Sequence, residues 1–398
     1  MDDAGRLLEC FGSGRLVRPS AGSANFVDLV RALLRLCGAV DVESGPGVER
    51  ICRLIGSAEH YVLVLVDGLG VKLLEELPAD GFLRSHLAAE LQAVFPPTTA
   101  SALTTLATGK WPCEHGVPGW WVYLERFKLS ATALRFVERF SERPLEEFGV
   151  SAADVFPAPS IWPGVKHEPL TVAGANIVNS TFSRYARGGT AGAGYAEVPE
   201  ALQIVRDRVG AGGRPSITYV YLPQLDAICH RHGTDDEGVG PLLAGLDEQL
   251  GDLANDLAGR ARLVIAADHG LVNTPPERTF ILEEDDPLMT DLICPPTGEP
   301  TVPICHVKPG RQEHFYDGFA RRFGGAFLLI TPDEAERLRL FGPGPLSPVT
   351  RRRLGSFLGI APEPAAVYFR PRTGAFHVHV GVHAGLSPEE MIIPLILS

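Results

Sequence analysis

The chain has 398 residues, of which 45% are hydrophobic and 21% are charged, and its formal net charge is -12. This composition is ordinary for a folded globular protein and excludes a disordered or fibrous chain. The acidic balance argues against nucleic acid or an anionic membrane as a general partner, so a phosphate-bearing ligand would need local positive charge. The length allows one large α/β domain or two to three smaller ones.

The first residues, MDDAGRLLECFGSG, lack a basic segment followed by an apolar run, so we expect no secretory signal. No apolar stretch approaches the length of a membrane span. The seven cysteines show no CxxC pair, which favours reduced thiols and a cytoplasmic protein.

The first periodic segment is residues 23–37, whose apolar side chains recur at helical spacing behind Ser23, a residue type that caps helices. It belongs to an N-terminal helical segment, 20–56. Residues 240–259 predict a crossover helix. Two stretches, about 123–215 and 275–370, are richer in Pro, Gly and charge, and we interpret them as insertions or a cap on the core.

Three short apolar runs predict buried parallel strands, and each is followed by an acidic residue. The runs are YVLVLV before Asp67, ITYVYL before Asp226, and RLVIAA before Asp268. Ligands bind at the carboxyl edge of open α/β sheets, so three carboxylates arriving there independently indicate a site.

Metal-ligating residue types gather around the same strand ends. Two neighbouring Zn²⁺ ions would need about six Asp and His ligands, and the chain offers that number at these positions. The candidates are Asp67, Asp226, His230, Asp268, His269 and His383. His377 and His379 alternate with apolar residues as on an ordinary strand, so we do not predict them as ligands.

Thr98 and Thr99 follow two prolines and precede a predicted helix that ends before Gly109. A threonine there is a good helix cap, but the free amides of a helix start also attract phosphate. The position of these threonines alone does not decide whether they cap the helix or act as a nucleophile. A threonine hydroxyl is a poor nucleophile at neutral pH, and a metal ion would activate it.

Five ordered motifs resemble those of the alkaline phosphatase superfamily, in particular its type I phosphodiesterase and nucleotide pyrophosphatase branch. They are VLVLVDGLG, FPPTTASALTTLATG with HGVPGW, LPQLDAICHRHG, AADHGLVN and HAGLSPEEMIIPLI. The last motif also resembles PglZ-like members. The resemblance implies an α/β fold, with an alkaline-phosphatase-like three-layer core, a mostly parallel central sheet, helices on both faces and a small cap.

The resemblance also implies roles for single residues. Thr99 matches the nucleophile, which becomes transiently phosphorylated, and Thr98 is the fallback. The ligands of one zinc ion are matched by Asp226, His230 and His383, and those of the other by Asp67, Asp268 and His269.

The sequence departs from the family pattern behind the nucleophile. Ala102 stands where an Asn is typical, and Thr104 and Thr105 are the candidates to replace its contact with phosphate. Trp120 and Trp121 follow, and we predict that they stack on a base or cover a leaving group. A sulfatase motif is absent, which disfavours sulfate esters.

We therefore predict that residues 1–398 form a single catalytic domain. It would hydrolyse phosphodiester or pyrophosphate bonds of a small phosphate ester or nucleotide-like substrate at a two-zinc site. One alternative is a phosphomonoesterase or phosphotransferase on the same site. Another is a non-catalytic protein that binds a phosphorylated ligand, because a fold does not guarantee activity.

Overall fold

The centre of the fold is a sheet built on the three predicted strands. The computed structural model describes residues 3–373 and 376–398. Strands β1 (His60–Val66), β8 (Ser216–Leu222) and β9 (Arg262–Ala266) lie side by side and parallel, with β1 in the middle. Every residue of β1 is buried, as expected for a strand covered on both faces.

Four further strands complete a seven-stranded sheet in the order β2-β18-β9-β1-β8-β6-β7. They are β2 (Leu87–Gln92), β6 (Glu168–Gly174), β7 (Ala191–Tyr195) and β18 (Ile392–Leu397). Among the described strands of this sheet, β18 alone runs against the others, inserted between β9 and β2. The sheet is thus mixed and mostly parallel, which confirms the predicted fold class.

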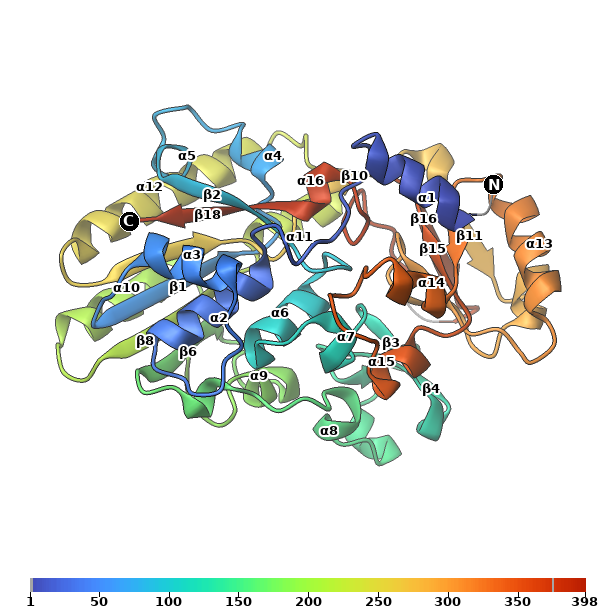
Figure 1. Cartoon of the computed structure of the whole chain (residues 1–398), viewed down its shortest axis with the longest axis horizontal. Helices are drawn as coiled ribbons and strands as arrows, with labels where there is room; N and C mark the ends of the chain where they lie inside the picture. The colour runs from blue at the N-terminus through green and yellow to red at the C-terminus, as the bar shows by residue number, and fades with distance from the viewer. Residues whose placement is uncertain (1–2, 374–375) are drawn as a thin grey trace.

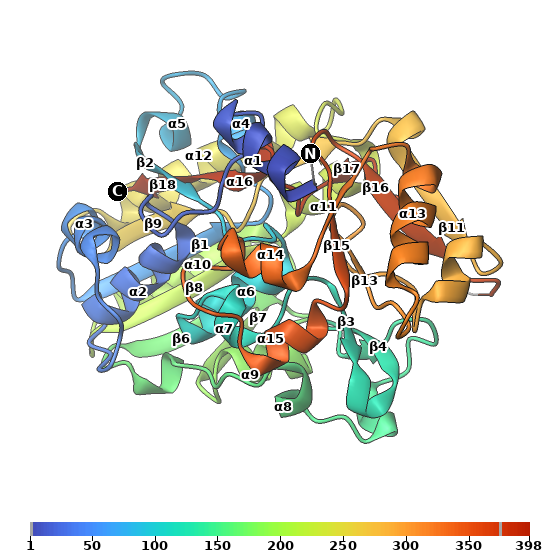
Figure 2. The ribbon, with the colours of Figure 1, turned by 45° about the vertical axis from the view of Figure 1, so that its right-hand side comes forward.

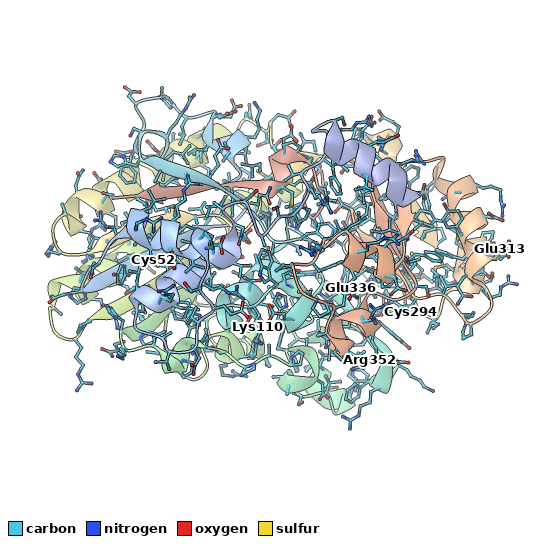
Figure 3. The ribbon with its side chains drawn as sticks, in the orientation of Figure 1. Cys52, Lys110, Cys294, Glu313, Glu336 and Arg352 are labelled. Atoms are coloured by element: carbon cyan, nitrogen blue, oxygen red, sulfur yellow. The ribbon has the colours of Figure 1, made fainter. Side chains whose placement is uncertain are left out.

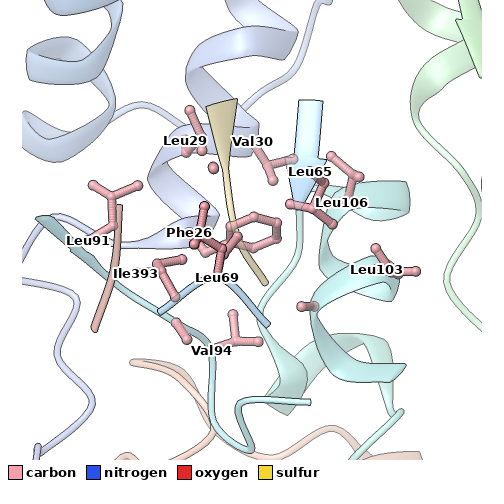
Figure 4. Packing of buried hydrophobic residues seen from close by; sticks show 14 of the residues in the cluster. Phe26, Leu29, Val30, Leu65, Leu69, Leu91, Val94, Leu103, Leu106 and Ile393 are labelled. Atoms are coloured by element: carbon pink, nitrogen blue, oxygen red, sulfur yellow. The ribbon is translucent and has the colours of Figure 1, made fainter. Parts of the chain in front are cut away.

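Helices cover both faces of this sheet (Figure 1). On one face α2 (Phe26–Leu36) packs against α3 (Pro46–Ile55) and α6 (Thr99–Thr108), and on the other α10 (Val198–Gly210) packs against α12 (Val239–Leu257). Figure 4 shows Phe26 and Leu29 of α2 meeting Leu65 of β1 and Ile393 of β18. The predicted Ser23 cap is wrong: Asn25 caps α2, its Oδ1 accepting a hydrogen bond from the Asp28 amide at 2.9 Å.

The remaining helices connect or flank these layers. They are α1 (Asp3–Gly12), α4 (Val71–Leu74), α5 (Phe82–Ser85), α7 (Pro112–His115), α8 (Ala152–Val155), α9 (Thr181–Ala186), α11 (Gln224–His232), α13 (Gln312–Phe323), α14 (Pro332–Arg337), α15 (Pro348–Arg353) and α16 (Pro388–Met391).

A second seven-stranded sheet, antiparallel throughout the described pairs, stands beside the first (Figure 2). Its strands, in spatial order, are β14 (Leu328–Ile330), β15 (Phe357–Ile360), β13 (Pro303–Cys305), β12 (Thr297–Gly298), β3 (Trp121–Leu124), β4 (Leu129–Thr132) and β5 (Val137–Glu138). Two small ribbons pair β10 (Val272–Asn273) with β17 (Gly381–Val382) and β11 (Thr279–Glu283) with β16 (Ala366–Arg370). The irregular stretch 275–370 therefore supplies most of the second sheet.

The other irregular stretch, 123–215, is divided between the two sheets. Its first part forms β4 and β5, whereas β6, β7 and α10 belong to the central sheet and its cover rather than to an insertion. The sequence obscures this because β7 is an edge strand of small residues, AGAGY, with little apolar surface to mark it.

One hydrophobic core joins the two sheets, since residues of the second sheet such as Ile304, Leu328 and Leu358 pack in the same cluster as β1. A smaller phenylalanine-rich cluster lies under α13. All seven cysteines are free, and Figure 3 shows Cys52 and Cys294 in opposite halves of the molecule. Among the described residues, none of the helices has the length and apolar character needed to cross a bilayer.

Candidate active site

The carboxyl ends of the central strands bring together the acidic residues that the sequence singles out. Asp67 follows β1, Asp268 follows β9, and Asp226 lies in the first turn of α11 after β8. Asp67 and Asp268 are 2% and 0% exposed. Two ionisable side chains buried this deeply beside each other need compensating positive charge.

Two groups of possible ligand atoms form around these acids. In each group the atoms lie within 4.8 Å of one another, and the groups are Asp67, Asp268, His269 and Asp226, His269, His383. His269 Nε2 lies 3.3 Å from Asp67 Oδ1 and 3.5 Å from Asp268 Oδ2. His269 therefore stands between the two groups.

His230 and His383 complete the predicted set. His230 Nε2 lies 3.3 Å from Asp226 Oδ1, one helical turn earlier on α11. The ring centroids of His230 and His383 are 5.1 Å apart, and those of His269 and His383 are 3.8 Å apart. All six predicted ligands thus lie close together, although the structure groups Asp226 and His383 with His269, and the predicted third ligand, His230, belongs to neither group.

The three histidines are oriented as metal ligands usually are. His230 Nδ1 donates to Gly381 O at 2.8 Å, His269 Nδ1 to Gly270 O at 3.1 Å, and His383 Nδ1 to Pro97 O at 3.1 Å. A carbonyl oxygen can only accept, so each proton lies on Nδ1 and each Nε2 keeps a free lone pair. Backbone carbonyls that fix the ring in this way are typical partners of metal-ligating histidines.

The carboxylates also have unused ligand atoms. Asp67 Oδ1, Asp226 Oδ1 and Asp268 Oδ2 are buried without a hydrogen-bond partner. Burial, with the charge of neighbouring acids, raises the pKa of Asp226 to about 8 and that of Asp67 well above its usual range. Orphaned oxygens and free imidazole nitrogens form a donor set that fits divalent cations.

Thr99 is the first residue of α6 and lies beside this cluster. Its Oγ1 is 3.2 Å from His269 Nε2, and the residue lines the cleft described below while only 7% exposed. Thr98 holds the N-cap position, but its side chain caps no amide of α6. Its hydroxyl instead donates to Glu299 Oε1 at 2.5 Å, so the first amides of α6 stay free of a side-chain cap.

Glu299 is a site residue that sequence reasoning missed. It directly follows β12, is 5% exposed, and accepts hydrogen bonds through Oε1 from the Thr98 hydroxyl and, at 2.7 Å, from the Trp120 amide. Burial raises its pKa to about 7. A single acid in the turn GEP matches no recognisable motif, so the sequence gives no signal for it. Only the packing of the second sheet brings it to Thr98.

A cleft of about 1170 Å³ opens over the acid and histidine cluster and continues between the two sheets. Asp67, Thr99, Asp226, His230 and His383 lie among its walls, as do Trp120 and Trp121, two of the predicted substrate contacts.

The other two predicted substrate contacts are not brought to the cleft. Thr98 is 0% exposed and binds Glu299. Thr105 is also 0% exposed, and its Oγ1 meets His115 Nε2 at 3.2 Å behind α6. Thr104 is likewise turned inward, donating to Ala100 O at 2.7 Å, so neither threonine takes the place of the missing Asn.

The segment after β16 differs from the prediction. Residues 376–380 form no strand, and the loop places the His379 ring 4.3 Å from that of His230, at the mouth of the cleft. The alternation of histidines and apolar residues resembled a strand face, but both Val378 and Val380 are 42% exposed. His379 therefore borders the site, although the sequence pattern gave no reason to predict it as a site residue.

Comparisons with known proteins agree with this geometry. A family model described as type I phosphodiesterase / nucleotide pyrophosphatase matches residues 61–322. The structure is similar to murine ectonucleotide pyrophosphatase / phosphodiesterase 5, with a TM-score of 0.63 at 17% identity over 84% of this chain and 87% of that chain. An inactive variant of the murine protein in complex with AMP gives a TM-score of 0.62 at 17% identity, with the same coverage of 84% and 87%.

Phosphonoacetate hydrolase from Sinorhizobium meliloti 1021, in complex with phosphonoformate, is also similar, with a TM-score of 0.59 at 16% identity over 85% of this chain and 89% of that chain. A sequence search of curated proteins found no match. At these identities the solved structures establish the fold, and the family model, which spans more than half of the chain, establishes the family. The chain therefore belongs to the type I phosphodiesterase / nucleotide pyrophosphatase family of hydrolases, within the alkaline phosphatase superfamily.

Proposed function

We propose that this protein hydrolyses phosphodiester or pyrophosphate bonds through a transient phosphate ester on Thr99, at a site that holds two divalent metal ions, which we propose are zinc. The observation that carries the proposal is the position of the Thr99 hydroxyl, 3.2 Å from His269, the residue shared by both groups of candidate ligands. A nucleophile placed between two candidate metal positions suits in-line displacement at phosphorus.

The chain's own residues account for binding and orientation. The amides at the start of α6 are free of a side-chain cap, and free amides at a helix start favour binding of phosphate oxygens. Glu299 fixes Thr98 and Trp120, which hold the nucleophile segment against the second sheet. When bound, the two ions would supply the positive charge that favours ionisation of the nucleophile and stabilises the leaving oxygen.

The size of the cleft supports a diester or pyrophosphate rather than a small monoester. At about 1170 Å³ it exceeds the space that a phosphate group needs and extends past Trp120 and Trp121, which offer aromatic faces to a planar group. A similar structure was solved with AMP, which supports a nucleotide-like substrate for this chain. Because the cleft takes residues from both sheets over one continuous core, we also propose that residues 1–398 act as a single catalytic domain.

The first test is hydrolysis of paired nitrophenyl phosphate mono- and diesters by zinc-loaded protein. We expect preference for the diester, and we expect Thr99→Ala to abolish turnover while leaving zinc binding and the unfolding transition intact. Thr99→Ser, which keeps a hydroxyl, is the matched control and should retain measurable activity. Full activity of Thr99→Ala would overturn the proposed nucleophile, and preference for the monoester would move the protein to the phosphatase class.

A further inference from the structure

Arg139 is a cation held in the wall of the cleft, away from the candidate metal ligands. It directly follows β5, and its backbone amide donates to Ser130 O at 2.9 Å. Its guanidinium lies 3.8 Å from the centroid of the Trp121 ring and 5.1 Å from that of Phe140. Stacking between aromatic rings fixes the plane of the guanidinium, so its donors are oriented before any ligand arrives.

Among the described residues, most of these donors have no hydrogen-bond partner. Nη1 donates to Pro296 O at 2.6 Å, which occupies one of the five N–H groups of the side chain. Within the described residues, no carboxylate lies at ion-pair distance from Arg139. The carboxylates of Glu138 and Glu299 act on it only as longer-range charges.

The other two arginines of the cleft are already occupied. Arg135 forms an ion pair with Glu142 at 2.8 Å. Arg187 donates through Nη1 to Val178 O and through Nη2 to Asn179 Oδ1, which ties both ends of its guanidinium to its own loop, although its buried Nε has no partner among the described residues. The contrast indicates that Arg139 is kept for a ligand rather than for the fold.

The cation is also partly withdrawn from water, and burial lowers its pKa to about 9. A partly buried guanidinium without a charged partner is unfavourable because it loses hydration. A ligand anion that accepts hydrogen bonds from it would offset this loss. The overall charge of the chain is -12, so a second anionic group on a ligand would be repelled by most of the surface.

Arg139 is connected to the nucleophile through a short series of contacts. Its partner Trp121 is next to Trp120, whose amide donates to Glu299 at 2.7 Å, and Glu299 accepts from Thr98, the neighbour of Thr99. A ligand with its phosphorus at Thr99 would therefore extend along Trp120 and Trp121 toward Arg139.

We propose that Arg139 determines specificity by binding a second anionic group, a carboxylate, phosphonate or phosphate, carried on the substrate arm distal to the scissile phosphate. The proposal rests on the proposed function of the same cleft and names the substrate class: phosphodiesters with a charged arm. A planar guanidinium donates two parallel hydrogen bonds to such an oxyanion.

The test uses two nitrophenyl phosphodiesters whose second arm ends either in a carboxylate or in a carboxamide of the same length. For zinc-loaded wild type we expect kcat/KM to favour the carboxylate about tenfold, the effect of one charge-assisted contact. Arg139→Gln should bring the ratio of the carboxylate rate to the carboxamide rate close to one. Arg135→Gln, which removes a cation already paired in the same cleft, should keep the preference.

A third arm ending in a phosphonate distinguishes the kinds of anion, and calorimetric titration of all three esters into zinc-loaded Thr99→Ala measures the preference without turnover. Equal rates and equal affinities for the carboxylate and carboxamide esters in the presence of intact Arg139 would overturn the distal-anion site, whatever the stability of Arg139→Gln. Absence of turnover with a clear preference in binding would instead overturn the proposed hydrolysis and retain the anion site.

Discussion

Replacing Asp268 by Asn should make the metal-free protein more stable and should reduce the stabilisation that zinc binding provides. Asp268 is fully buried, and its Oδ1 accepts from the amides of Gly68 at 3.2 Å and His269 at 3.1 Å. An Asn side chain can keep both of these bonds. Asp268 Oδ2, in contrast, accepts no hydrogen bond, so the substitution removes a buried negative charge while these two bonds are kept.

The size of the effect follows from the titration of this carboxyl. Burial, with the charge of Asp226 added, raises the pKa of Asp268 from 3.8 to about 7. Each pKa unit corresponds to about 1.4 kcal/mol, so the ionised carboxylate destabilises the metal-free fold by on the order of 4 kcal/mol. The folded protein binds the proton more tightly than the unfolded chain, so wild-type stability falls as pH rises from 3.8 through about 7.

The assay is urea unfolding of EDTA-treated wild type and Asp268→Asn at about pH 5 and about pH 8. The advantage of the variant should grow with pH by a few kcal/mol. Zinc at about a hundred times its dissociation constant should add about 2.7 kcal/mol to wild type and less to the variant, which narrows the advantage of the variant. Asp252→Asn, at an exposed position of α12, is the control and should change neither value.

Equal stability of the two EDTA-treated proteins at the higher pH would refute the reasoning. The ionised carboxylate of Asp268 would then not destabilise the metal-free fold, and a bound cation would have no such cost to offset. A variant that gains as much from zinc as wild type does would separately refute the role of Asp268 as a ligand.

Two further substitutions test the surroundings of the site. Glu299→Ala leaves the Thr98 hydroxyl and the Trp120 amide without their acceptor, so we expect a loss of about 1–3 kcal/mol in urea unfolding and a fall in kcat on the order of tenfold; unchanged kcat would show that Glu299 does not position the nucleophile segment. Gly70→Ala would place a Cβ atom 2.8 Å from Gly270 Cα and 2.9 Å from Glu389 O, so thermal unfolding should reveal a loss of about 1–3 kcal/mol, whereas Gly240→Ala on α12, with open space around it, should be neutral or stabilising.

The central strands and the acids that follow them could be predicted because their signal is local. A run such as YVLVLV is buried on both faces, and parallel strands end at the same edge of a sheet. Because Asp67, Asp226 and Asp268 each follow such a strand, the sequence predicts that they lie close together. The strand in 217–222 and the helix in 240–259 were confirmed for the same reason.

The contacts of the site could not be predicted where they depend on packing between distant elements. Glu299 contacts Thr98 although the two residues are 201 positions apart in the sequence, and no sequence pattern around either residue predicts this contact. Thr105 was predicted to face the substrate, but six residues along a helix turn it about 240° from Thr99, onto the face that meets His115. The loop that carries His379 was read as a strand because period-two alternation alone does not distinguish the two.

The position of β18 has a consequence for synthesis of the protein. This strand lies between β9 and β2, and its residues, 392–397, emerge from the ribosome about 300 residues after those of β2. Until that segment is made, β2 has no neighbour in the sheet and the edge of β9 is open. The Gly70 and Gly270 loops also lack the Glu389 backbone against which they pack. During synthesis the site therefore cannot form before almost the whole chain described here has been translated, and in this interval the exposed edge is the place where a chaperone would be needed.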